Sequence, residues 1–216
     1  MIRPSAIIFD YGNVLCRPQS GADVHTMAAI LNLPVEDFQA RYWRPRLAYD
    51  EAVLDPASYW NTVAERSLSG AEIDQLNDID SKSWTHAAPV MPEWARQVRA
   101  AGTRTAILSN MPLPVRERLD RSGWLPEFDH RTFSCDVRMA KPGPEIYLHS
   151  LRGLGVAAGE ALFLDDRPEN IHAAEALGIH SILYTTPANL AKHIRDRFDI
   201  PPLHVATVGS GDEEDQ

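Results

Sequence analysis

The sequence predicts an α/β fold of three layers, in which a mostly parallel sheet lies between helices. Three observations support this fold class: short apolar runs recur along the chain, helical patterns separate them, and a glycine follows each helical pattern. A short continuous apolar run is typical of a strand that is buried on both faces. Strands that alternate with helices pair in parallel, because each helix returns the chain to the end of the sheet where the next strand starts.

Four apolar runs predict buried strands, and a fifth run predicts another on weaker grounds. The first run covers residues 5–9, is partly β-branched, and stops at a polar stretch that contains glycine. The other clear runs are residues 105–108, 161–164 and 181–184, and the weaker one is residues 131–134. Enrichment in β-branched and aromatic residues favours strands over helices in such short runs.

Four further segments show the apolar spacing of helices and stop at a glycine. They are residues 93–101, 115–122, 145–154 and 169–177, followed by Gly102, Gly123, Gly155 and Gly178. Glycine readily adopts the left-handed conformation with which many helices end. We expect these helices to connect the parallel strands.

Residues 17–90 interrupt the alternation, because signals for helix starts occur there and short apolar runs do not. Asp55 precedes Pro56, as an N-cap acid precedes a proline in the first helical position, and Ser69 and Glu72 have the spacing of a capping box. We therefore expect an all-helical insertion after the first strand. The predicted division is an α/β domain of residues 1–16 and 91–205, a helical segment of residues 17–90, and a disordered acidic tail of residues 206–216.

Composition and charge exclude several classes of protein. The 216 residues carry a formal charge of −9, which disfavours a general nucleic-acid binder and gives no attraction to an anionic membrane. The same charge repels phosphorylated metabolites, unless local cations or a metal ion reverse the field at one site. Cys16 and Cys135 are too few for a disulfide framework, and the apolar run 6–9 is too short for a signal peptide or a membrane span. We therefore expect a cytoplasmic protein.

Polar residues follow three of the predicted strands, at the point where each strand ends. Asp10 follows the first strand, Ser109 and Asn110 the second, and the pair Asp165–Asp166 the fourth. Ligands bind at this edge of open parallel sheets. Three carboxylates in one small site repel one another when they are ionised, so a raised pKa or a bound cation is expected. A hydrated site with hard oxygen ligands suits Mg²⁺.

Four sequence motifs, in this order, resemble those of the haloacid dehalogenase-like hydrolase superfamily. They are Ile7–Leu15 with Asp10, Ala106–Asn110 with Ser109, Lys141–Pro144, and Leu162–Asp166 with Asn170 following. The resemblance spans residues 6–184 and implies a Rossmann-like core with a C1 cap, which the helical insertion would form. The first motif is most similar to a subgroup of sugar-phosphate phosphatases, the α-glucose-1-phosphatase-like proteins.

The resemblance implies that Mg²⁺ is held by the Asp10 carboxylate, the Gly12 carbonyl and Asp166. Asp10 would attack phosphorus and form an aspartyl-phosphate, which water then hydrolyses. Asp165 would lie behind these ligands, next to Lys141. Enzymes that transfer phosphoryl groups commonly combine carboxylates, a basic side chain and a metal ion in this way.

The remaining motif residues would serve the substrate and the acids. Ser109, the backbone N–H of Asn110 and the Lys141 ammonium would bind the phosphoryl oxygens. Two interpretations of Asn170 remain open, because it would either orient the acids or simply lie in the first turn of the following helix. The substrate implied is a small phosphorylated metabolite, with sugar phosphates as candidates, and neither nucleic acids nor membranes are expected partners. The sequence does not indicate the oligomeric state.

Gly12 departs from the superfamily pattern, because phosphatases of this kind carry a second aspartate there as general acid and base. A glycine carbonyl still binds a metal, but it donates no proton to a poor leaving group, a transfer that contributes about 10²–10⁴-fold. The absence of an acid at position 12 has three possible consequences: the substrate has a good leaving group, the cap supplies the acid, or turnover is slow. Asp50, in the aromatic and basic stretch 41–50, is the first candidate for such an acid, and the alternative is a surface residue on a cap helix.

Two other functions compete with the phosphatase. A 2-haloacid dehalogenase would use Asp10 to displace halide, which needs neither a proton nor a metal, so Gly12 would be no handicap. A non-catalytic module would bind a phosphorylated metabolite without turnover. The paired acids Asp165 and Asp166 favour the phosphatase, because the dehalogenase branch lacks them.

Overall fold

The computed structural model describes residues 1–125 and 127–205, and its centre is a parallel sheet of five strands in the order β3-β2-β1-β4-β5. The strands are β1 (Ala6–Phe9), β2 (Arg104–Ser109), β3 (His130–Phe133), β4 (Ala161–Asp165) and β5 (His180–Leu183). All five predicted strands are confirmed, including the weaker one at β3. Strand β1 lies in the middle and pairs with β2 on one side and β4 on the other.

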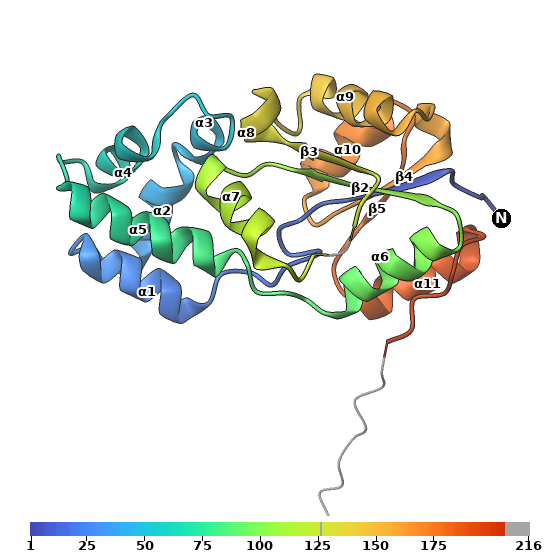
Figure 1. Ribbon diagram of the computed structural model, residues 1–216, viewed down its shortest axis with the longest axis horizontal. Coiled ribbons are helices and arrows are strands. Elements are labelled where there is room, and N and C mark those ends of the chain that lie inside the picture. The colour runs from blue at the N-terminus through green and yellow to red at the C-terminus, as the bar shows by residue number, and fades with distance from the viewer. Residues whose placement is uncertain (126, 206–216) are drawn as a thin grey trace, which may run out of the picture.

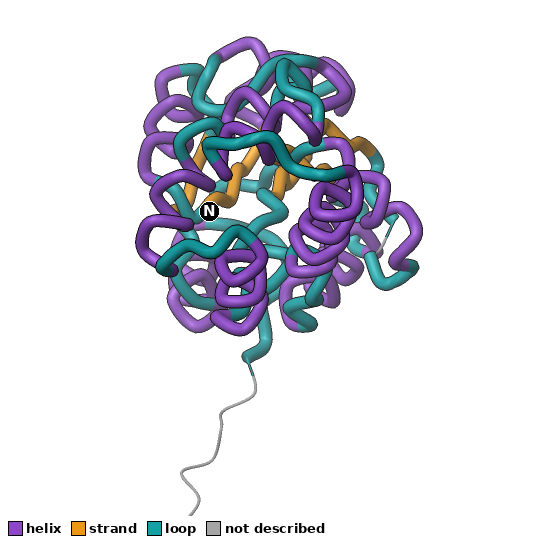
Figure 2. The backbone as a smooth tube through the Cα atoms, turned by 90° about the vertical axis from the view of Figure 1, so that its left-hand side faces the viewer, coloured by secondary structure: helices purple, strands orange, loops and turns teal. Residues whose placement is uncertain are grey.

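Helices cover both faces of the sheet. On one face lie α9 (Pro144–Leu154) and α10 (Pro168–Ala176), and on the other lie α6 (Val90–Ala100), α7 (Leu113–Ser122) and α11 (Pro187–Arg197) (Figure 1). Figure 2 shows the strands between the two helical layers. The predicted three-layer, Rossmann-like α/β fold is therefore confirmed.

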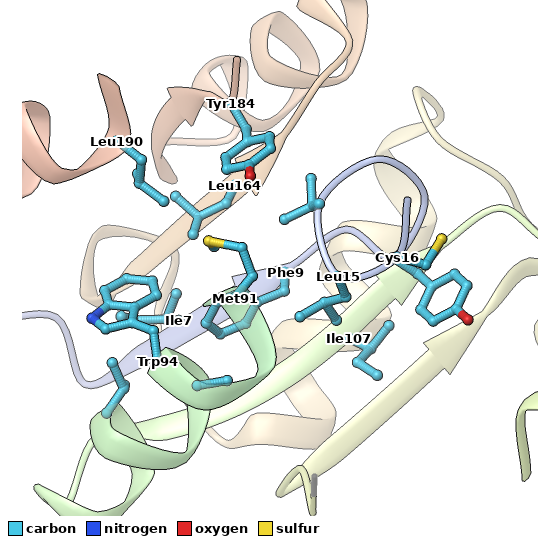
Figure 3. Packing of buried hydrophobic residues seen from close by; sticks show 14 of the residues in the cluster. Ile7, Phe9, Leu15, Cys16, Met91, Trp94, Ile107, Leu164, Tyr184 and Leu190 are labelled. Atoms are coloured by element: carbon cyan, nitrogen blue, oxygen red, sulfur yellow. The ribbon is translucent and has the colours of Figure 1, made fainter. Parts of the chain in front are cut away.

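Alternate residues of β1 face the two cores, as strand geometry requires. Ile7 and Phe9 pack with Met91 and Trp94 of α6 (Figure 3), whereas Ala6 and Ile8 pack toward α9 and α10. All four side chains of β1 are fully buried. This burial explains why the first motif begins as a continuous apolar run rather than an alternating one.

Most helix ends lie where the glycines predicted them. Gly123 and Gly155 are the C-caps of α7 and α9 and have positive φ angles of 68° and 66°. Helix α6 begins at Val90, three residues before the predicted start at Glu93. The analysis above did not predict α11, although Thr186 followed by Pro187 is an N-cap and first-turn signal, and the Thr186 side chain does accept from Asn189 N–H. The short helix α8 (Ser134–Val137) follows β3 directly and was not predicted either.

The segment between β1 and α6 contains five helices, which we call the helical insertion. They are α1 (Gly21–Ile30), α2 (Val35–Trp43), α3 (Arg46–Asp50), α4 (Pro56–Ala64) and α5 (Gly70–Ser83). The insertion has an apolar core of its own, which includes Phe38, Tyr59, Trp60 and Leu76. Both predicted caps are confirmed: Asp55 accepts from Ser58 N–H, and Ser69 and Glu72 form the capping box.

The helical insertion contacts the α/β part of the chain through α5 and α7, which pack against each other. Arg118 of α7 forms an ion pair with Asp78 and donates from Nε to Ser81 Oγ at 2.9 Å. The exact limits of the two parts, 1–16 with 91–205 and 17–90, stay a prediction, and the acidic tail lies outside the described residues. Among those residues, no helix is long and apolar enough to cross a membrane.

Candidate functional site

The strand order places the candidate site at the carboxyl ends of β1, β2 and β4. From β1 the chain first builds the sheet toward β2 and β3 and then reverses toward β4 and β5, which creates a switch point beside β1. A cavity of about 370 Å³ lies there. It is lined by seven residues that the sequence singled out: Asp10, Gly12, Ser109, Asn110, Lys141, Asp166 and Asn170.

Lys141 joins two of the three acids. Its Nζ lies 2.7 Å from Asp10 Oδ1 and 2.6 Å from Asp165 Oδ2, and the side chain is almost fully buried. The Asp165 carboxylate also accepts from Asn170 Nδ2 at 3.0 Å and from Arg167 N–H at 2.8 Å. Asp165 is thus satisfied by protein donors, and the contact with Asn170 agrees with the interpretation that Asn170 orients the acids.

The three carboxylates crowd one another. One oxygen each of Asp10, Asp165 and Asp166 lies within 4.8 Å of the others. Burial raises the pKa of Asp10 to about 7, and the charges of Asp165 and Asp166 add to this rise while Lys141 opposes it. Burial also raises the pKa of Asp166, with Asp165 contributing. Burial alone would lower the pKa of Lys141, but its two carboxylate partners outweigh that effect and raise it, so the lysine stays charged.

The donor set therefore fits a divalent cation. Three carboxylates face one ammonium, which leaves two negative charges uncompensated in a buried site. Asp10 Oδ1 is occupied by Lys141 and by Tyr11 N–H at 2.7 Å. Asp10 and Asp166 both line the cavity, where hard oxygen ligands suit Mg²⁺.

Asn110 has a role that the sequence analysis missed. Its backbone N–H was the predicted phosphate donor, but its side chain pairs with the backbone of Lys141, accepting from Lys141 N–H at 2.9 Å and donating to Lys141 O at 2.8 Å. The loop after β2 therefore fixes the loop that carries the lysine. Ser109, at the end of β2, is buried and lines the cavity.

Asn13 is a second residue that the analysis missed. Its φ of 58° is in the left-handed region, which asparagine tolerates better than most residues. In this conformation its Nδ2 donates to Asp166 Oδ2 at 2.7 Å. The polar, glycine-containing stretch after the first strand was visible in the sequence, but the partner of the Asn13 side chain was not.

Only some residues of the stretch 41–50 in the helical insertion line the cavity. Arg41 and Arg44 form ion pairs with Glu65, each at 3.0 Å, and do not line the cavity. Trp43, Arg46 and Asp50 line the cavity, whereas Tyr42 and Tyr49 belong to the core of the insertion. The surface alternative for Asp50 is wrong, because this residue is only 7% exposed. Trp84 and Arg167 also line the cavity and were not predicted.

Comparison with known proteins gives one family match and several partial relatives. The haloacid dehalogenase-like hydrolase family matches residues 4–178. Acyl-CoA dehydrogenase family member 10 of Mus musculus is 35% identical over 131 residues, 59% of this chain and 12% of that protein. Flavin mononucleotide hydrolase 1 of Arabidopsis thaliana is 36% identical over 63 residues, 29% of this chain and 26% of that protein. Sesquiterpene phosphatase astK of Aspergillus oryzae is 31% identical over 90 residues, 41% of this chain and 46% of that protein. The chain thus spans less than half the length of each of these relatives.

Solved structures share the fold at low sequence identity. A predicted HAD-like hydrolase of Porphyromonas gingivalis is 23% identical with a TM-score of 0.71, and the match covers 91% of this chain and 97% of that one. A HAD-family enzyme of Bacteroides thetaiotaomicron, in complex with magnesium and inorganic phosphate, is 19% identical with a TM-score of 0.70, covering 86% and 95%. A 2-haloacid dehalogenase of Pseudomonas syringae is 20% identical with a TM-score of 0.59, covering 87% and 88%. The fold is therefore shared by an enzyme that binds magnesium and inorganic phosphate and by a dehalogenase. The chain belongs to the haloacid dehalogenase-like hydrolase family.

Proposed function

We propose that this hydrolase is a phosphatase that acts on a small phosphorylated metabolite through an aspartyl-phosphate on Asp10. The observation that carries the proposal is the close approach of Asp10, Asp165 and Asp166, the first two of which contact one buried lysine, beside a cavity. A substitution at carbon with loss of halide needs one carboxylate and no such excess of charge. Three carboxylates are useful where a cation and a phosphate bind together.

Asp10, the Gly12 carbonyl and Asp166 would hold Mg²⁺, as predicted from the resemblance. When bound, the ion would offset the negative charge that the carboxylates and the phosphate bring together. Asn13, which donates to Asp166 at 2.7 Å, would keep that carboxylate turned toward the cavity. Asp165 is already satisfied by Lys141, Asn170 and Arg167 N–H, so we assign it to holding the lysine.

The residues of the chain suffice to describe the proposed reaction at phosphorus. Lys141 and Tyr11 N–H hold Asp10 Oδ1 and so orient the carboxylate that would attack phosphorus. As the new O–P bond forms, the bond from phosphorus to the leaving oxygen breaks, and charge spreads over the other phosphoryl oxygens. Ser109 Oγ, Asn110 N–H and the Lys141 ammonium would bind these oxygens. Water then attacks the aspartyl-phosphate, releases phosphate and restores Asp10.

The cavity favours a compact organic group on the phosphate. Its volume of about 370 Å³ is near the lower end of ligand sites. Trp43 and Trp84 line it, and their rings meet edge to face at a centroid distance of 6.4 Å. Aromatic walls beside Arg46 and Asp50 suit a ring that carries hydroxyl groups. These features, and relatives that are named as a flavin mononucleotide hydrolase and a sesquiterpene phosphatase, support a phosphate ester, with sugar phosphates as the class to try first.

One observation favours the dehalogenase as a second candidate: Gly12 supplies no acid, and halide needs none. The deciding experiment measures phosphate release from a panel of phosphorylated metabolites and from p-nitrophenyl phosphate, with and without Mg²⁺, beside chloride release from 2-chloropropionate. We expect phosphate release that a chelator abolishes. Asp10→Asn should remove it, while the exposed Asp37→Asn serves as the matched control. Chloride release that is indifferent to the chelator would establish the dehalogenase instead, and binding without turnover would establish the non-catalytic module.

A further inference from the structure

We propose that Asp50 of the helical insertion is the general acid that protonates the leaving group, the role that Gly12 cannot fill. This inference rests on the proposed phosphatase function and names the residue that completes it.

The position of Gly12 lies next to a residue of the insertion. A Cβ built on Gly12 would lie 3.6 Å from Trp84 Cζ3, so a side chain there would pack beside the indole ring. Among the described residues, the carboxyl groups that line the cavity belong to Asp10, Asp50 and Asp166. Asp10 is the proposed nucleophile and Asp166 a proposed metal ligand. Asp50 is the one that remains.

The backbone of Asp50 is tied to the loop that would bind the phosphate. Ser134 Oγ donates to Asp50 O at 2.6 Å and accepts from Met111 N–H at 2.9 Å. Met111 directly follows Asn110, whose N–H is a proposed phosphate donor. Figure 1 shows α3, which ends at Asp50, beside α8, which begins at Ser134. One buried hydroxyl therefore sets the position of Asp50 relative to the reacting group.

Asp50 shares its guanidinium partner with a second buried acid. Arg46 is shared: its Nε lies 2.8 Å from Asp50 Oδ1 and its Nη1 lies 3.2 Å from Asp80 Oδ2. Asp80 also accepts from Tyr42 at 2.6 Å and from Gln19 at 3.1 Å, so its carboxylate has several donors besides the shared guanidinium. For Asp50, the only hydrogen bond to the carboxyl group from within the described residues is the one from Arg46. Few donors therefore stabilise the charged form of the buried Asp50 carboxyl group, which favours its protonated form.

The electrostatic balance agrees with this geometry. Burial raises the pKa of Asp50 to about 6; Arg46 opposes the rise, Asp80 adds to it, and Arg167, which reaches the group from the loop after β4, opposes it. A group with such a pKa gives and takes protons near neutral pH, as a general acid and base must. Arg46 is in turn held over the rings of Tyr42 and Tyr49, at 4.9 and 5.7 Å from their centroids, which fixes the pair in place.

The proposed step balances in protons. As the bond from phosphorus to the leaving oxygen breaks, the proton of Asp50 moves to that oxygen, and the alcohol leaves neutral. The Asp50 carboxylate then takes a proton from the water that attacks the aspartyl-phosphate. Phosphate is released, and Asp50 is protonated again.

The experiment compares two substrates that differ in their need for a proton. Glycerol phosphate has a poor alkoxide leaving group, whereas the nitrophenolate of p-nitrophenyl phosphate leaves without protonation. With Asp50→Asn, kcat on glycerol phosphate should fall by about 10²-fold or more, while kcat on p-nitrophenyl phosphate falls by less than about tenfold. The wild type should show a decline in kcat on glycerol phosphate as pH rises above about 6, and this decline should disappear in the variant. Asp50→Glu should recover part of the activity on glycerol phosphate.

Controls distinguish this inference from a structural role and from failure of the proposed function. Glu51→Gln changes the neighbouring residue, which does not line the cavity, and should affect both substrates little. Equal losses on both substrates, or a change confined to KM, would show that Asp50 only holds the substrate or the fold and would overturn the inference. If Asp50→Asn lost activity on both substrates through misfolding, Asp50→Glu would decide. Equal recovery on both substrates would contradict the role of Asp50 as general acid. Recovery on glycerol phosphate that depends on pH would support this role. A wild type that hydrolyses neither substrate would instead overturn the phosphatase itself.

Discussion

Two buried acidic clusters face the same cavity and differ in how their charge is balanced. The core cluster consists of Lys141 with Asp10, Asp165 and Asp166, and the insertion cluster consists of Arg46 with Asp50 and Asp80. The core cluster has two carboxylates more than it has basic groups, and the insertion cluster has one. An excess of two charges suits a divalent cation, whereas an excess of one suits a proton. The comparison shows how one site can hold both a metal and an acid.

The two basic residues also differ in a way that fits their clusters. Lys141 is a compact charge whose single nitrogen reaches two carboxylates at 2.7 and 2.6 Å. Arg46 spans Asp50 and Asp80 with separate nitrogens and lies against tyrosine rings. A planar guanidinium keeps a fixed geometry toward each partner, which an ammonium does not. The insertion cluster can therefore hold Asp50 in a defined orientation although the carboxylate faces a cavity.

The largest effect should come from removing the nucleophile of the core cluster. Asp10→Asn keeps the shape of the side chain and an oxygen for Lys141, but an amide does not form an acyl-phosphate efficiently. We expect turnover of every phosphate ester to fall by at least about 10³-fold, with an unchanged circular dichroism spectrum. Steady-state rates measured side by side with Asp37→Asn provide the check. Near-normal hydrolysis by Asp10→Asn would exclude the aspartyl-phosphate.

The next effect tests the position that lacks an acid. With Asp50 as the proton donor, kcat of the wild type should depend only weakly on the pKa of the leaving group, and Gly12→Asp alone should change the rates little. In the Asp50→Asn background, aryl phosphates should be hydrolysed faster than sugar 1-phosphates and those faster than glycerol phosphate, and there Gly12→Asp should accelerate the poor leaving groups selectively, by up to about 10²-fold. The slope of log kcat against leaving-group pKa measures this. If Gly12→Asp is added to Asp50→Asn and leaves the slope unchanged, the side chain at position 12 does not reach the leaving group.

A smaller effect should separate the acids within the core cluster. Asp166→Asn removes a proposed metal ligand, and Asp165→Asn removes only a partner of Lys141. We expect the Mg²⁺ concentration for half-maximal activity to rise about 100-fold for Asp166→Asn and about tenfold for Asp165→Asn. Titration calorimetry with Mg²⁺ alone provides a reading that does not depend on turnover. The reverse order of the two variants would place the metal between Asp10 and Asp165.

The smallest effect concerns stability. Because burial raises the pKa of Asp10 to about 7, the folded state binds a proton there more tightly than the unfolded state does. The resulting stabilisation is present below the ordinary pKa of 3.8 and is lost as pH rises through about 7. In chelator at pH 8, Asp10→Asn should therefore raise the free energy of unfolding by on the order of 1 kcal/mol, which is about 2–4 °C in Tm. Added Mg²⁺ should stabilise the wild type and reduce the difference. A variant that is less stable than the wild type in chelator would show that Lys141 already compensates the charge of Asp10.

Strand and motif positions could be predicted from the sequence because they depend on local pattern. Apolar runs predicted all five strands. The motifs at the ends of those strands predicted that Asp10, Ser109, Lys141 and Asp166 lie at one site, and all four line the same cavity. The contribution of the helical insertion could not be derived in the same way. Which side of α3 faces the cavity depends on how the insertion packs against α7 and α8. This packing cannot be predicted from the sequence of residues 41–50. Asp50 was therefore a candidate, while Trp84, more than thirty residues further along, carried no signal at all.

The contact between Gly12 and Trp84 also constrains which substitutions this chain could accept over time. The two residues come from different parts of the chain, yet a Cβ at position 12 would lie 3.6 Å from the indole ring at position 84, so side chains at the two positions share the space beside the nucleophile. Among relatives that retain a bulky aromatic residue at the equivalent of position 84, we expect glycine or alanine at the equivalent of position 12 and an acid at the equivalent of position 50. Relatives with an aspartate at position 12 should have a smaller residue at position 84 and should tolerate the loss of the acid at position 50. Positions 12, 50 and 84 should thus covary. An ancestor that moved the acid from one of positions 12 and 50 to the other would have kept activity on poor leaving groups only if the new acid appeared before the old one was lost.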